Sequence, residues 1–204
     1  MQNPTLEIIL GPMFSGKSSE LIRRIRICKS INREIMVIKP KIDDRYISDK
    51  ICSHDSISED CLVLEDLQEL FDNKNFLEKL LKATIIFIEE GQFFKSLVNN
   101  VLEILEKYQK DVVIAGLDGD SNRKSFGELL QLIPYANNVT KLNSMCKVCN
   151  NGTLAPFTFR RNSSVNIDNQ ILVGGSELYL PTCRKHYLEL QEIGVIMNSM
   201  DTSL

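Results

Sequence analysis

The chain has 204 residues, 43% of them hydrophobic and 25% charged, which is enough for one sizeable core and a small additional unit. Its formal net charge of −3 gives no general reason to bind a polyanion such as DNA, so we expect small molecules rather than nucleic acid as partners. The sequence contains no apolar run near the roughly 20 residues that span a bilayer and no secretion signal, so we expect no membrane association and a cytoplasmic protein.

Short apolar runs alternate with helical patterns over the first part of the chain. Four runs are rich in β-branched residues, as buried parallel strands are, and they cover Leu6–Leu10, Ile35–Lys39, Thr84–Ile88 and Val112–Ala115. Between them, Ser18–Ser30 and Phe94–Tyr108 carry apolar residues at the spacing of an amphipathic helix. The alternation predicts an α/β fold, a parallel sheet flanked by helices, over residues 1–142.

The first predicted strand leads into a glycine-rich loop and then a helix. The loop satisfies the pattern G-x-x-x-x-G-K-[ST] and comprises Gly11, Pro12, Met13, Phe14, Ser15, Gly16, Lys17 and Ser18. Backbone amides of such a loop surround phosphates, Lys17 reaches the outer phosphates, and Ser18 is placed to bind Mg²⁺. The pattern therefore predicts a site for ATP with Mg²⁺, and the strand and helix around it favour this function over an ordinary glycine turn.

Two adjacent carboxylates, Glu89 and Glu90, follow the third apolar run. An enzyme with a phosphate-binding loop needs acidic groups at a neighbouring strand end, which hold the metal and activate the nucleophile. Successive residues of a strand point to opposite faces, so one carboxylate can lie near Mg²⁺ while the other faces the acceptor. We assign Glu89 to the metal and Glu90 to the catalytic base; the alternative is that both simply begin a loop.

A second unit is expected after residue 142, where cysteine pairs and Gly-Gly replace the alternation. Cys146-x-x-Cys149 and Cys183-x-x-His186 have the spacing of metal-ligand pairs and suit tetrahedral Zn²⁺ in a closed structural site. Buried reduced thiols are the alternative. We expect an α/β unit over residues 1–142, a zinc-binding unit over 143–192, and a flexible C-terminal tail over 193–204.

Five segments together make the chain recognisable: Gly11–Ser18, Asp43–Tyr46 (DDRY), Glu89–Phe94 (EEGQFF), Leu117–Phe126 (LDGDSNRKSF) and Val173–Tyr187 (VGGSELYLPTCRKHY). In this order they resemble the cytosolic, or type II, thymidine kinase family of cells, bacteria and large DNA viruses. The resemblance covers nearly the whole chain. It implies a P-loop NTPase (RecA-like) sheet and a small zinc-ribbon domain that carries a lasso around the nucleoside.

The resemblance also implies the reaction, in which Mg-ATP phosphorylates the 5′-hydroxyl of thymidine to give dTMP. Glu90 matches the family's catalytic carboxylate, which accepts the proton of that hydroxyl. Glu89 stands where the family usually has aspartate, so its contact with Mg²⁺ is direct or through water. The zinc ligands match positions at which the family often has four cysteines, with His186 as a change of ligand type.

Nucleoside-binding positions are implied in the same way. The matched residues are Asp43, Arg45, Gln92, Phe93, Leu117, Ser121, Thr158, Val173, Gly174, Gly175 and Tyr179. Many relatives have an aromatic residue at the position of Ser121, so we expect a thinner pocket wall and a lower affinity for thymidine. The glycine pair suits a lasso that binds the base through main-chain groups, because a missing Cβ permits close approach.

The family further implies dTTP as a feedback inhibitor and a homotetramer. Two other classes share some of these features. A nucleic-acid-dependent ATPase with a zinc ribbon also combines a phosphate-binding loop with cysteine pairs, but the acidic composition disfavours it. A catalytically silent nucleotide sensor is the other, and the presence of Lys17, Ser18 and Glu90 argues against it.

Overall fold

The central feature of the computed structural model, which describes residues 3–42, 49–52, 58–161, 170 and 174–201, is a six-stranded parallel sheet. Its order is β5-β2-β6-β7-β1-β8. The strands are β1 (Leu6–Leu10), β2 (Ile35–Pro40), β5 (Leu62–Leu64), β6 (Ile85–Ile88), β7 (Asp111–Gly116) and β8 (Asn138–Lys141). Because all six run in the same direction, the loops that follow them gather at one edge of the sheet.

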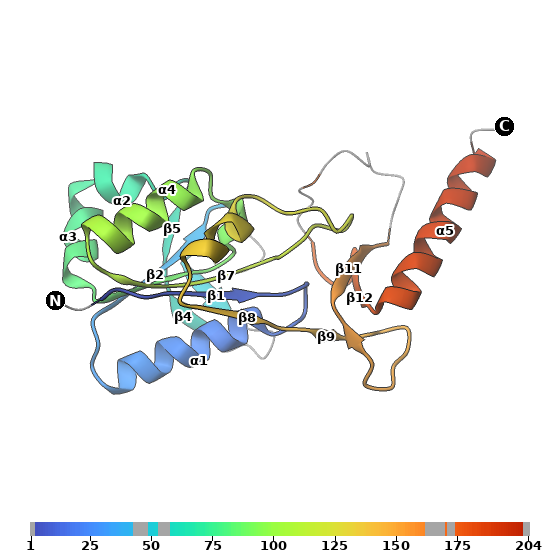
Figure 1. The fold of residues 1–204 in the computed structure, drawn as a ribbon, viewed down its shortest axis with the longest axis horizontal. Helices are drawn as coiled ribbons and strands as arrows, with labels where there is room; N and C mark the ends of the chain where they lie inside the picture. The colour runs from blue at the N-terminus through green and yellow to red at the C-terminus, as the bar shows by residue number, and fades with distance from the viewer. Residues whose placement is uncertain (1–2, 43–48, 53–57, 162–169, 171–173, 202–204) are drawn as a thin grey trace.

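Helices cover both faces of this sheet (Figure 1). One face carries α1 (Lys17–Ser30). The other face carries the remaining helical segments of the large unit, which are α2 (Glu69–Asp72), α3 (Lys74–Lys82), α4 (Leu97–Leu102), η2 (Glu103–Lys107) and η3 (Leu129–Tyr135). A short helical turn, η1 (Gly91–Phe93), follows β6, and a hairpin of β3 (Lys50–Cys52) and β4 (Ser58–Asp60) contacts α1 through Ile51.

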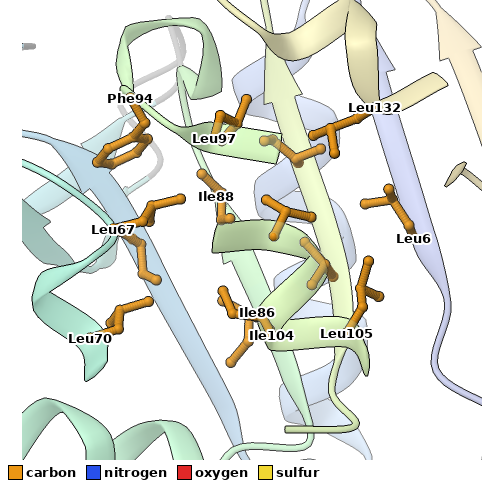
Figure 2. Close-up of a cluster of buried hydrophobic side chains, with 14 of the residues drawn as sticks. Leu6, Leu67, Leu70, Ile86, Ile88, Phe94, Leu97, Ile104, Leu105 and Leu132 are labelled. Carbon is orange, nitrogen blue, oxygen red and sulfur yellow. The ribbon is translucent and has the colours of Figure 1, made fainter. Parts of the chain in front are cut away.

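The alternation of side chains along each strand divides the core into two layers. In β6, Ile86 and Ile88 point into the layer under α4, whereas Phe87 points into the layer under α1. Figure 2 shows the first of these layers, where Ile88 lies among helix and loop side chains such as Leu67 and Leu97. Strands that are buried on both faces read as continuous apolar runs, which is why four of them could be predicted from the sequence.

A small unit follows the sheet. It consists of β9 (Ser144–Met145) paired with β10 (Leu154–Ala155), β11 (Phe157–Arg160) paired with β12 (Tyr179–Thr182), and the helix α5 (Arg184–Asp201). Both pairs are antiparallel.

The predicted α/β fold with a parallel sheet flanked by helices is confirmed. Helix α5 continues to Asp201, so residues 193–201 of the expected tail are helical, while the division of the chain at 142 and 192 stays a prediction. None of the helices in the described residues is long and apolar enough to cross a membrane.

Candidate functional site

The loop between β1 and α1 has a backbone that requires glycine at two positions. Gly16 has φ 83°, a left-handed conformation that other residues adopt only with strain. A Cβ on Gly11 would lie 2.6 Å from Ser15 Oγ and 2.7 Å from the carbonyl oxygen of Leu142. The loop can therefore close tightly at the strand end only because these two residues lack side chains.

Two polar side chains of this loop are turned inward. Lys17 is 8% exposed, and its Nζ donates a hydrogen bond to the carbonyl oxygen of Pro12 at 2.9 Å. The hydroxyl of Ser15 is buried and makes no hydrogen bond to any described residue. A buried ammonium group, a buried hydroxyl and the N-terminus of a 14-residue helix together suit a phosphate chain.

Glu89 connects this loop to the end of β6. Its carboxylate is buried and accepts a hydrogen bond from the Ser18 hydroxyl. Strand β7 lies between β1 and β6 in the sheet, so the contact bridges two strands that are not neighbours. A hydroxyl and a carboxylate held together beside a phosphate-binding loop are the oxygen ligands that Mg²⁺ uses.

Glu90 lies at the same edge of the sheet and is held by Gln92. It is 9% exposed and has φ 50°, an uncommon conformation for a residue other than glycine. Gln92 Nε2 donates to Glu90 Oε2 at 2.7 Å, and Gln92 Oε1 accepts from the backbone N–H of Leu117 at 3.0 Å. The carboxylate is thus fixed to the loop that follows β7, with its orientation set by a buried amide.

The small unit contacts the phosphate-binding loop directly. The hydroxyl oxygen of Thr158 in β11 accepts a hydrogen bond from the backbone N–H of Met13 at 2.9 Å. Tyr179 is paired with Arg160 two residues further along β11, so it lies on the same face of this hairpin as Thr158. This face of the small unit therefore points toward the edge of the large sheet that carries the two glutamates.

Four potential metal ligands converge in the small unit. The ligand atoms of Cys146, Cys149, Cys183 and His186 all lie within 4.8 Å of one another. His186 Nδ1 lies 3.2 Å from Cys149 Sγ and 3.3 Å from Cys183 Sγ, while His186 Nε2 lies 3.8 Å from the carboxylate of Glu189. Burial opposes ionisation of Cys146, but hydrogen bonds from the backbone N–H groups of Cys149, Cys183 and Val148 and from the His186 side chain together lower the pKa of this thiol to about 6. Three thiols and an imidazole in this arrangement can hold a metal ion.

Comparison with known proteins decides the family. A family model described as "Thymidine kinase" matches residues 4–187. This chain belongs to the thymidine kinase family.

Individual relatives carry the same name. "Thymidine kinase a" of Arabidopsis thaliana is 42% identical over 183 residues, which are 90% of this chain and 74% of the relative. "Thymidine kinase" of Mycoplasma mobile is 36% identical over 200 residues, which are 98% of this chain and 94% of the relative. Among solved structures, AMPPCP-bound DnaA from Aquifex aeolicus aligns with a TM-score of 0.42 at 13% identity, covering 70% of this chain and 41% of that one.

The structure describes several of the residues expected from the thymidine kinase family. Leu117 and Ser121 are half-buried in the loop after β7, and Phe93 packs edge-on against Phe126 with ring centroids 5.3 Å apart. The Gly175 N–H donates to Glu177 Oε1 at 2.6 Å, which lowers the pKa of that carboxyl. Gly174, beside Gly175, is half-buried. Three further expected residues, Asp43, Arg45 and Val173, lie outside the described residues.

Sequence reasoning missed Asp120 and Tyr187 within the segments that match the thymidine kinase family. The buried Asp120 accepts hydrogen bonds at Oδ1 from the backbone N–H groups of Asn122 and Lys124, and it thereby folds the 117–126 loop into a turn. The available signal in the sequence was the Asp-x-Asn spacing of residues 120–122, which is typical of such a turn. Tyr187 contacts the same loop from α5, and nothing local in the sequence indicated that contact.

Proposed function

We propose that this protein is a thymidine kinase that transfers the γ-phosphoryl group of ATP to the 5′-hydroxyl of thymidine, giving dTMP and ADP. The observation that carries the proposal is the position of Glu90. Its carboxylate is buried, held by Gln92, and located at the same sheet edge as the phosphate-binding loop and the Ser18–Glu89 contact. Membership of the thymidine kinase family supports the choice of acceptor.

The loop supplies the phosphate side of the reaction. Backbone N–H groups of residues 13–18 would surround the phosphates of ATP, and Lys17 would exchange its contact with Pro12 for the outer phosphates. Ser18 and Glu89 would hold Mg²⁺, directly or through water. When bound, Mg²⁺ supplies charge neutralisation for the transferred group. The buried Ser15 hydroxyl of the same loop would be a further donor.

Glu90 supplies the acceptor side. The 5′-oxygen of thymidine forms a bond to the γ-phosphorus as the bond from that phosphorus to the β,γ-bridging oxygen breaks, and ADP leaves. The proton of the hydroxyl passes to the Glu90 carboxylate. The hydrogen bond from Gln92 fixes the orientation of this carboxylate, so the base is positioned before the acceptor arrives.

The nucleoside would lie between the 117–126 loop and the small unit. We assign Phe93, Leu117 and Thr158 to the walls around thymine. Tyr179 would contact the sugar, and Gly174 and Gly175 would belong to the lasso that binds the base through its main chain. The same proposal includes residues outside the described part, namely Asp43, Arg45 and Val173.

The four ligand side chains, Cys146, Cys149, Cys183 and His186, would hold structural Zn²⁺. All four protein ligands are present, which leaves no open coordination position for chemistry. We also propose dTTP as a feedback inhibitor, a homotetramer and a cytoplasmic location, on the strength of family membership alone.

The test is ADP release by the purified protein with Mg-ATP, measured with thymidine, with deoxycytidine and without an acceptor. Release that depends on thymidine supports the kinase. Equal release in all three reactions would mean an ATPase instead. Release that occurs only in a fourth reaction, with added DNA, would indicate a nucleic-acid-dependent enzyme. No release under any condition would indicate a nucleotide sensor.

A further inference from the structure

Tyr187 connects α5 to the loop between β7 and η3. Its side chain is 0% exposed, and it follows His186 directly in the first turn of the helix. The hydroxyl donates a hydrogen bond to the carbonyl oxygen of Ser121 at 2.7 Å and accepts one from Gln191 Nε2 at 2.9 Å. A buried phenol with both of its hydrogen-bonding roles used in this way fixes whatever it contacts.

The ring of Tyr187 makes a second contact with the same loop. The guanidinium carbon of Arg123 lies 4.3 Å from its ring centroid and 5.5 Å from that of Phe157. Arg123 has φ 61°, a conformation that a residue other than glycine holds only where its surroundings stabilise it. The loop is therefore attached to the small unit both by a hydrogen bond and by a cation over an aromatic ring.

The other end of this loop is attached to the large unit. The backbone N–H of Leu117 donates to Gln92, the residue whose amide also holds Glu90. Figure 1 shows the chain after β7 extending from the sheet toward β11 and β12. The loop thus begins at Leu117, which is bonded to the residue that orients the proposed base, and continues to Ser121, which is held by Tyr187. Its conformation depends on both attachments.

We propose that Tyr187 is a positioning residue that holds the 117–126 loop in the conformation that forms one wall of the nucleoside site. The inference rests on the proposed function, because that wall is assigned to thymidine. Tyr187 touches neither ATP nor the acceptor in this account. It raises the fraction of molecules in which the wall is formed, and apparent nucleoside affinity scales with that fraction.

The test compares Tyr187→Phe with the wild-type protein. The variant keeps the ring and its contact with Arg123 but removes the hydroxyl. We expect the KM for thymidine to rise about 3- to 10-fold, the effect of one lost buried hydrogen bond, with kcat and the KM for ATP within about twofold. Tyr135→Phe, at a half-exposed position on η3, is the matched control and should change nothing.

Amide hydrogen exchange of residues 117–126 without substrate gives a readout independent of activity. We expect faster exchange in Tyr187→Phe and an unchanged metal content. Unchanged exchange, or faster exchange with an unchanged KM for thymidine, would overturn the positioning role. An absence of thymidine-dependent turnover in the wild-type protein would instead overturn the proposed function. The assignment of the loop to a nucleoside site would then be wrong as well.

Discussion

The α/β unit and the cysteine-bearing unit are held together by different interactions. In the first, paired strands and two layers of helices bury side chains such as Ile38 and Phe87 completely. In the second, strands are two to four residues long, and the buried cluster comprises Cys146, Ala155 and Cys183. Strands this short do not form a stable fold by pairing alone. We therefore expect the chemistry to depend on the first unit and the nucleoside site to depend on a metal held by the second.

Glu90→Gln should produce the largest effect and should affect only the chemical step. The amide has the same shape but cannot accept the acceptor's proton, so we expect kcat to fall by a factor of about 100 to 10,000. Steady-state kinetics with thymidine measure this. The control is Glu106→Gln, at an exposed position on η2, which should leave kcat unchanged. A variant at position 90 with nearly full turnover would mean that another group accepts the proton.

Cys183→Ser should affect the second unit and leave the first folded. Loss of one ligand should remove most of the bound metal and reduce thymidine-dependent turnover at least about tenfold. We expect far-UV circular dichroism to change little, because the sheet and its helices have their own core. Metal analysis and activity measure the effect. Cys28→Ser, a half-buried thiol on α1, is the control. Full activity without metal would contradict the dependence of the nucleoside site on this cluster.

Thr158→Val tests the hydrogen bond between the two units. The substitution preserves the shape of the side chain but leaves the Met13 N–H without its acceptor. Since Met13 belongs to the phosphate-binding loop and Thr158 to the proposed nucleoside site, we expect the KM values for ATP and thymidine both to rise, by about 3- to 10-fold. Thr140→Val, in edge strand β8, should change neither. A change in only one of the two KM values would show that the units act independently.

Glu20→Gln should have the smallest effect, confined to the α/β unit. The hydrogen bond from Arg23 lowers the pKa of Glu20 from 4.5 to about 2, with Arg24 adding to it and burial opposing it. The Arg23 side chain is 60% exposed, although Glu20 is only 21% exposed, so solvent screens the pair and we expect the variant to lose only about 0.5 kcal/mol at pH 7. A carboxyl with a lowered pKa stabilises the fold above its unfolded value of 4.5, and this contribution is lost as the pH falls toward 2.

Urea unfolding at pH 7 and pH 3 tests this direction of the pH dependence. The difference in unfolding free energy between Glu20→Gln and wild type should be smaller at pH 3. An equal difference at both pH values would mean that the contribution of Glu20 does not come from its charge.

The parts of the fold that depend on local patterns were predictable from the sequence. Buried parallel strands read as apolar runs, and the loop of residues 11–18 carries its glycines at fixed spacing. Edge strand β8 was missed because an exposed edge tolerates residues such as Asn138 and Lys141. Strands β9 to β12 were missed because strands of two to four residues show no periodicity.

Within the candidate site, residue types could be predicted but contacts could not. Glu89 and Glu90 were assigned from their place at a strand end. Gln92, which holds Glu90, is itself bonded to Leu117, 25 residues further along the chain. The contact between Tyr187 and Ser121 spans 66 residues. The first contact arises from packing within the α/β unit and the second from the packing of the two units against each other, and no local pattern encodes either.

The most direct measurement follows the phosphoryl group itself. ATP labelled at the γ-phosphate is supplied with thymidine and Mg²⁺, and the label is traced after separation of the products. We expect one labelled phosphoryl group in dTMP for each ADP released. Label appearing in inorganic phosphate, with thymidine unchanged, would contradict the account.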